Sequence, residues 1–219
     1  MARGNRVPGR VAAVAAVLVA CLSGCTASRT TPEADNPGGA VISNRNEDTT
    51  FHGAEPAQPY RMPNVTLTAD NGQPFNLVTD TAYPVTLVFF GYTNCPDVCP
   101  LVLGDLSATY LQLPAPVRER TQVLFITTDP ARDTDEVLRG YLARYNPAFL
   151  GLTGSLVSIK TVAEVLGVPV SGMKRLPGGG YDVGHGAQVI GFRDNRAPVV
   201  WTEGTAVPDM VSDVIRLAG

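Results

Sequence analysis

Two cysteines lie in the turn after a largely apolar run, and this junction constrains the fold more than any other part of the chain. The run is Val85 to Phe90, and the turn after it carries Cys95 and Cys99 as Cys-Pro-Asp-Val-Cys-Pro. Such a run is typical of a strand buried on both faces of a sheet. Two thiols at its end can close a disulfide or chelate a soft metal. The alternative, two unreactive core cysteines, gives no reason for the flanking prolines.

Extended and helical patterns alternate along the rest of the chain and predict an α/β fold. We expect a thioredoxin-like fold, with a central mixed sheet flanked by helices and an N-terminal β-hairpin around Asp70-Asn71-Gly72. The thiols then lie at a strand-to-helix turn, where open α/β sheets bind ligands. Besides the central strand, the expected strands are 65–68, 75–77, 123–127, 187–192 and 199–201. The expected helices are 101–113, 133–145, 155–166 and 207–217; Thr134 can cap the second of these and Ser155 begins the third.

The spacing of the two thiols permits either chemistry. Residues at i and i+4 are neighbours on one face of a helical turn, with Cα atoms about 6 Å apart, near the upper end of disulfide geometry. Pro96 and Pro100 suit the start of a helix. The N–H groups at a helix start stabilise a thiolate, which is the reactive and metal-binding form.

A third ligand for a metal would have to come from one of two histidines. His52 lies in a polar segment before the domain, and His185 ends the Gly-rich stretch 174–186, just before an expected strand. Two thiolates favour Cu(I), and an added imidazole lets Cu(II) be held as well. Composition alone leaves open whether His185 is a ligand or a solvated loop residue. A structural zinc site would need four protein ligands, and only three candidates remain.

The N-terminus predicts export. Three arginines precede an apolar run over 11–22, which is too short to span a bilayer and has the length of a signal-peptide core. The run ends in Leu22-Ser23-Gly24-Cys25, which resembles a bacterial lipobox. We expect residues 1–24 to be a signal peptide, Cys25 to be lipidated, 25–60 to be a flexible tether and 61–219 to be the folded domain. An ordinary signal peptide with a chance cysteine is the alternative.

Acylation at Cys25 would hold the protein on the outer face of the cell membrane, since two acyl chains suffice for stable anchoring. Cys21 would be removed with the signal, leaving Cys95 and Cys99 as the only remaining thiols. Removal of the signal takes away three of 17 basic residues and none of 20 acidic ones, so the net charge becomes 14 − 20 = −6. An acidic domain argues against a nucleic-acid partner.

Five sequence blocks carry a resemblance to a known family: 88–100, 125–134, 138–145, 149–154 and 181–185. Taken in register, they resemble the Sco/SenC family of copper chaperones, which are thioredoxin-fold proteins. The resemblance implies copper, as Cu(I) or Cu(II), bound by Cys95, Cys99 and His185. It also implies that the protein assists assembly of the copper site of cytochrome c oxidase, with the copper-site subunit and a copper donor as partners.

The chain departs from that family beside the histidine. The family has an Asp-His-Ser sequence where this chain has Gly184-His185-Gly186. A metal-bound imidazole normally donates its second N–H to an acceptor, and Asp182 could replace the missing neighbours. A thiol–disulfide oxidoreductase acting on exported proteins is the competing function, so whether the protein is an enzyme stays open. A peroxidase is disfavoured, because a peroxidatic cysteine usually stands three positions after a threonine, in a Thr-x-x-Cys arrangement, whereas Thr93 stands only two positions before Cys95.

Overall fold

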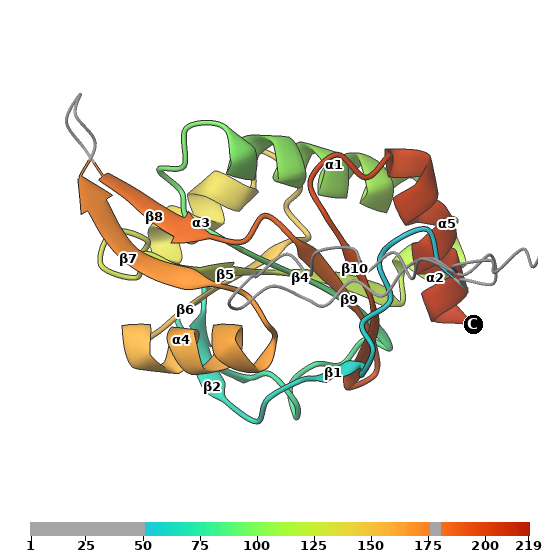
Figure 1. The fold of residues 1–219 in the computed structure, drawn as a ribbon, viewed down its shortest axis with the longest axis horizontal. Coiled ribbons are helices and arrows are strands. Elements are labelled where there is room, and N and C mark those ends of the chain that lie inside the picture. Colours follow the sequence, from blue (N-terminus) through green and yellow to red (C-terminus); the bar gives the residue numbers. More distant parts are fainter. Residues whose placement is uncertain (1–50, 176–180) are drawn as a thin grey trace, which may run out of the picture. The chain divides into compact units, whose positions relative to one another are not determined.

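A mixed sheet of eight strands forms the centre of the domain in the computed structural model, which describes residues 51–175 and 181–219, with side chains described outside 171–185 (Figure 1). The strand order is β1-β10-β9-β4-β5-β6-β2-β3. Strands β4, β5 and β6 run parallel, and the remaining pairs are antiparallel. The bounds are β1 Tyr60–Arg61, β2 Thr66–Ala69, β3 Pro74–Asn76, β4 Val85–Gly91, β5 Thr121–Thr127, β6 Leu150–Thr153, β9 Val189–Arg193 and β10 Arg196–Trp201.

The apolar run after residue 84 forms the central strand β4, as predicted. All seven of its residues are buried. The strand pairs with β5 along its whole length and with β9 from Val85 to Phe89. Because both faces and both edges are covered, a continuous apolar sequence is what this position requires. The hairpin β2–β3 around Gly72 is also confirmed.

In the part of the chain that the structure describes, five helices cover the sheet in two layers (Figure 1). One core layer joins one face of β4 and β5 to α1, α3 and α5, and the other joins the opposite face to α4. The predicted caps are present: Thr134 accepts a bond from the N–H of Val137, and Ser155 from that of Ser158. The bounds are α1 Val98–Gln112, α2 Ala115–Arg118, α3 Asp135–Leu142, α4 Leu156–Val165 and α5 Val207–Ala218.

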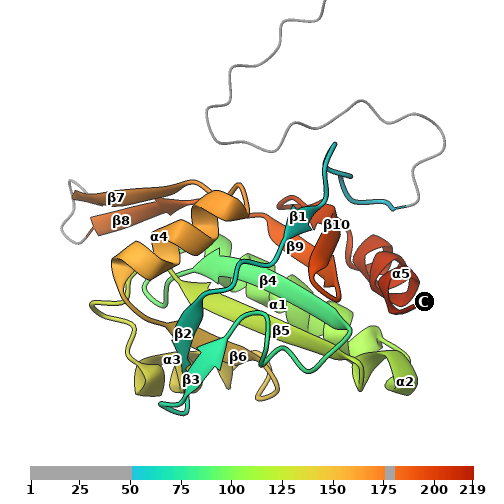
Figure 2. The same cartoon turned by 90° about the horizontal axis from the view of Figure 1, so that it is seen from below.

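The Gly-rich stretch before β9 is a hairpin rather than the expected loop. Strands β7, Val170–Arg175, and β8, Tyr181–His185, form a separate antiparallel sheet that extends from the eight-stranded one (Figure 2). Residues 176–180 between them lie outside the described part. The sequence concealed this hairpin because neither arm alternates regularly between apolar and polar residues.

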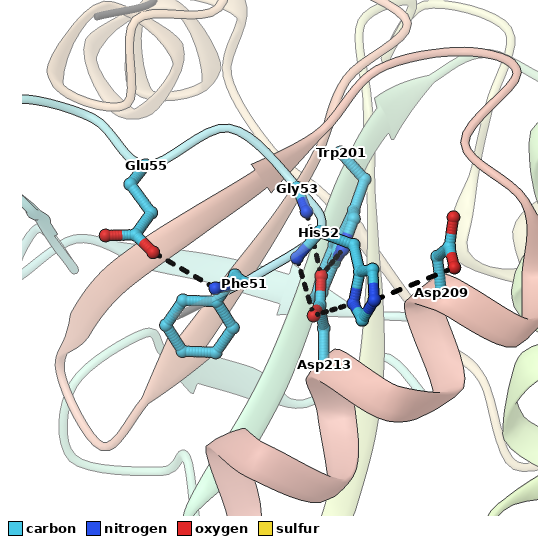
Figure 3. Close-up of polar contacts among 7 residues, drawn as sticks. All are labelled: Phe51, His52, Gly53, Glu55, Trp201, Asp209 and Asp213. Carbon is cyan, nitrogen blue, oxygen red and sulfur yellow. Dashed lines mark hydrogen bonds and ion pairs between the residues drawn. The ribbon is translucent and has the colours of Figure 1, made fainter. Parts of the chain in front are cut away.

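Residues 51–60, which we expected to belong to the tether, pack on the domain in the structure. Ala54 forms a two-bond bridge with Val200 of β10, and Tyr60 begins β1. We call residues 51–54 the strap (Figure 3). The predicted signal peptide, Cys21 and Cys25 lie outside the described residues. Within the described part, no helix has both the length and the apolar character needed to cross a bilayer.

Candidate metal centre

The two cysteines meet where β4 turns into α1. Cys95 precedes the helix, and Cys99 lies in its first turn, where its backbone N–H donates to Cys95 Sγ over 3.3 Å. Asp97 caps the helix by accepting from the N–H of Val98. Both thiols are reduced and buried, with Cys95 9% exposed and Cys99 fully covered. The structure therefore brings together the two sulfurs that the sequence paired.

The two sulfurs are not equivalent. Cys95 Sγ receives an N–H at the start of a helix, an arrangement that stabilises negative charge on sulfur. The pKa of Cys99 is raised far above its usual range, first by its hydrogen bond with the Cys95 side chain and then by burial. The negative charge of Asp133 adds to this shift. The buried Cys99 thiol therefore favours its protonated form when no metal is bound.

A buried carboxylate holds the turn that carries the thiols. Asp133 is fully buried and accepts bonds from Thr93 N at 2.9 Å, Thr93 Oγ1 at 2.6 Å and Thr127 Oγ1 at 2.6 Å. It thereby ties the turn after β4 to the end of β5. The sequence gives Asp133 only as part of a resembling block and as the start of an expected helix, and no local signal points to its role beside the thiols.

The strand end beside the thiols has no room for a side chain. A Cβ added to Gly91 would lie 2.8 Å from Phe125 Cε2 and 2.9 Å from Cys99 Sγ, well inside normal contact. Glycine therefore lets the Phe125 ring and the Cys99 sulfur pack directly against the backbone of β4.

A buried phenol lies in the same core layer. Tyr141 on α3 is 5% exposed, and its ring centroid is 6.0 Å from that of Phe125. Its hydroxyl forms no hydrogen bond within the described part of the chain. Burial raises the pKa of Tyr141, and the neighbouring Tyr145 and the two cysteines raise it further. The two cysteines therefore pack in the same hydrophobic cluster as Phe125 and Tyr141.

His185 is placed by its backbone. It is the last residue of β8 and pairs with Val170. The chain then enters β9 at Val189, which pairs with Phe89 near the end of β4. Four residues span at most about 13 to 14 Å, so the histidine backbone is confined to the neighbourhood of the sheet edge that carries the thiols. Its side chain is outside the described ones, and among those described no three His, Cys, Asp or Glu residues gather as a metal site.

The fold and the dithiol turn together define a class of protein. The domain is thioredoxin-like, with a reduced cysteine pair at the junction of a central strand and the following helix. The family model described as SCO1/SenC matches residues 55–218. The chain therefore belongs to the SCO1/SenC family, which agrees with the resemblance seen in the sequence.

Individual relatives support the same assignment. A Stutzerimonas stutzeri protein named for copper binding is 41% identical over 108 residues, covering 49% of this chain and 52% of its own length. The solution structure of apo Sco1 from Thermus thermophilus is 33% identical with a TM-score of 0.68, covering 78% of this chain and 99% of that one. The structure of Bradyrhizobium japonicum ScoI with copper bound is 28% identical with a TM-score of 0.62, covering 73% and 97%. The chain thus spans about half of the curated S. stutzeri relative.

Proposed function

We propose that this protein binds copper through Cys95, Cys99 and His185 and carries it, from a lipid tether at Cys25, to the copper site of cytochrome c oxidase. The family membership supports this proposal, as does the copper-bound structure of a family member. Copper is cargo in this function rather than a resident cofactor. A copper donor and the copper-site subunit of the oxidase would be the partners.

One observation carries the proposal: the helix-start N–H of Cys99 points at the sulfur of Cys95, while both sulfurs are shielded from water. A thiolate pair of this kind suits soft Cu(I), since thiolate ligands select it over harder ions. Shielding also limits oxidation of the pair. An imidazole from the β8 end, close to the same sheet edge, would add the nitrogen that Cu(II) prefers.

The decisive experiment titrates the reduced full chain with Cu(I) under anaerobic reducing conditions, and separately with Cu(II) after the reductant has been removed, and compares wild type with the His185→Ala variant. Wild type should bind one copper at this site in either oxidation state. The His185→Ala variant should keep a weaker Cu(I) site and lose Cu(II) binding there, while Cys95→Ser should lose both. Unchanged binding of both ions by His185→Ala would remove His185 from the ligand set.

A thiol–disulfide oxidoreductase is the second candidate, because such chemistry needs one more accessible thiol to attack the substrate and a second, more buried thiol to complete the exchange. Cys95 is 9% exposed and accepts the backbone N–H of Cys99, whereas Cys99 is fully covered and its pKa is raised by the Cys95 side chain and by burial. Iodoacetamide should therefore modify Cys95 faster than Cys99 in the reduced protein. Reduction of a disulfide substrate at equal rates by wild type and His185→Ala would favour this candidate.

The membrane tether is tested separately. Cys25→Ala should release the protein from the membrane fraction or block its processing, because the acyl chains would have no attachment point. If the variant stays membrane-bound at the mature size, the lipoprotein proposal is wrong, whatever the copper result.

A further inference from the structure

A second polar cluster lies away from the thiols, where the strap crosses α5 (Figure 3). At its centre is Asp213, which is fully buried. Its Oδ1 accepts from the backbone N–H of His52 at 2.9 Å, and its Oδ2 accepts from Gly53 N at 2.9 Å and Trp201 Nε1 at 2.8 Å. These bonds fix the carboxylate in position and orientation.

The same carboxylate orients a histidine ring. His52 Nδ1 lies 2.9 Å from Asp213 Oδ1, so the ring is held at one nitrogen, and its other nitrogen, Nε2, faces Asp209 (Figure 3). The His52 side chain is 47% exposed. A carboxylate bound to one imidazole nitrogen, with the other nitrogen open, is the arrangement that supports metal-binding histidines in proteins, because it fixes the ring and strengthens the free nitrogen as a donor.

A further carboxylate stands beside that open nitrogen. Asp209, one turn before Asp213 on α5, has its Oδ1 3.9 Å from His52 Nε2 and is 48% exposed. Bonds of about 2.0 to 2.2 Å from a metal to nitrogen and oxygen allow two ligand atoms of one ion to lie about 2.9 to 4.2 Å apart. In the described part of the chain, no lysine or arginine forms an ion pair with Asp209 or Asp213.

We propose that His52 Nε2 and Asp209 form a second metal site, for a divalent first-row ion with Cu(II) bound most tightly, and that Asp213 positions the histidine. An imidazole and a carboxylate are harder ligands than thiolates. The affinity of such a site for divalent first-row metals rises from Mn(II) to Cu(II) and falls again at Zn(II). Water completes the coordination, since two protein ligands leave positions open. A bound ion would also join the strap to α5. The proposal does not rest on the copper function of the thiols.

The test isolates the site in the full chain. Replacing all four cysteines by serine and His185 by alanine leaves His52 as the only histidine and removes every thiol. This background should bind one Cu(II), and pulsed paramagnetic resonance should show modulation from one imidazole nitrogen. His52→Gln should remove that modulation and the binding. Asp209→Asn should weaken binding about 10-fold, and Asp213→Asn about 10- to 100-fold, as expected for the partner of a ligating histidine.

Asp194→Asn, which changes an exposed carboxylate in the β9–β10 turn, is the matched control and should change nothing. If Asp213→Asn fails to fold, the variants at the half-exposed residues His52 and Asp209 still test the proposal. Binding of Cu(II) without imidazole modulation, or with equal affinity after His52→Gln, overturns the proposal. Wild-type titrations that fail at the thiols but succeed here would sink the proposed function and leave this site standing.

Discussion

Asp133 and Asp213 are both fully buried carboxylates, and each fastens a segment distant in sequence, but they do so with different partners. Asp133 accepts two hydroxyl bonds and one backbone N–H, from Thr93 and Thr127. Asp213 accepts two backbone N–H bonds and an indole N–H, and it also contacts the imidazole of His52. Both replace lost hydration with several donors, which is what a buried charge requires.

The two carboxylates differ in whether their donor groups could find other acceptors if the carboxylate were removed. Hydroxyls can rotate to other acceptors, whereas the backbone and indole N–H groups around Asp213 have no alternative once it is gone. Each region also contains a glycine that permits close approach: Gly91 lies against Cys99 in the thiol region, and Gly53 lies against Trp201 in the strap region. Two of the three donors that hold the thiol turn can therefore find other partners, whereas the N–H donors that hold the strap cannot.

Asp213→Ala should have the largest effect. It leaves buried N–H groups of Gly53 and Trp201 unpaired, so we expect about 3 to 5 kcal/mol of lost stability. Denaturant unfolding followed by Trp201 fluorescence measures this loss, since the chain has a single tryptophan. Cys95 alkylation rates should stay within about twofold of wild type at low denaturant. A loss below that of Asp133→Ala would reverse the comparison.

Asp133→Ala should cost less, about 2 to 4 kcal/mol, because the hydroxyls of Thr93 and Thr127 can turn to other acceptors. Its specific effect should appear at the thiols, since the turn before Cys95 loses its tie to β5. We expect Cys95 and Cys99 to be alkylated several-fold faster, as measured by mass spectrometry of time-quenched samples. Unchanged thiol reactivity would show that Asp133 does not position the turn.

Gly53→Ala and Gly91→Ala form a matched pair. In Gly53→Ala the new methyl would meet Val199 Cγ2 at 2.5 Å, and in Gly91→Ala it would meet Phe125 and Cys99 Sγ at under 3.0 Å. Each should cost about 1 to 3 kcal/mol through overpacking. Only Gly91→Ala should alter copper binding or thiol reactivity. Equal effects of both changes on the thiols would mean that the two regions are coupled.

Thr93→Val should have the smallest effect. It removes the hydroxyl bond to Asp133 but keeps the backbone one, so we expect a loss of about 1 kcal/mol. The midpoint of urea unfolding should fall with an unchanged slope. Thr127→Val should cost more, because the Thr127 hydroxyl also accepts the buried backbone N–H of Asp129. If Thr93→Val lost as much free energy of unfolding as Asp133→Ala, the Thr93 hydroxyl alone would account for the stabilisation by Asp133.

Local signals in the sequence predicted most of the scaffold. The apolar run of β4, the Thr134 and Ser155 caps and the turn at Gly72 each lie within a few residues of the structure they specify. The thiol pair was predicted for the same reason, because strand, turn and helix start are consecutive.

Contacts distant in sequence escaped prediction. His52 and Asp213 are 161 positions apart, and nothing near residue 52 announces a buried carboxylate on the last helix. The segment around His52 therefore resembled a tether, although the structure packs it against β10 and α5. The short strand β6 was missed because its four residues, Leu150–Thr153, include a glycine and show little periodicity.

The full burial of β4 has a consequence for the lifetime of the thiol geometry. Amide hydrogens of a strand paired on both edges exchange with solvent only when the whole domain opens. The scaffold beneath Cys95 should thus persist through many encounters with other molecules, and fraying of the sheet cannot serve to release an ion. Release from such a site would be paced by displacement, with an incoming molecule supplying new ligands while the strand stays closed.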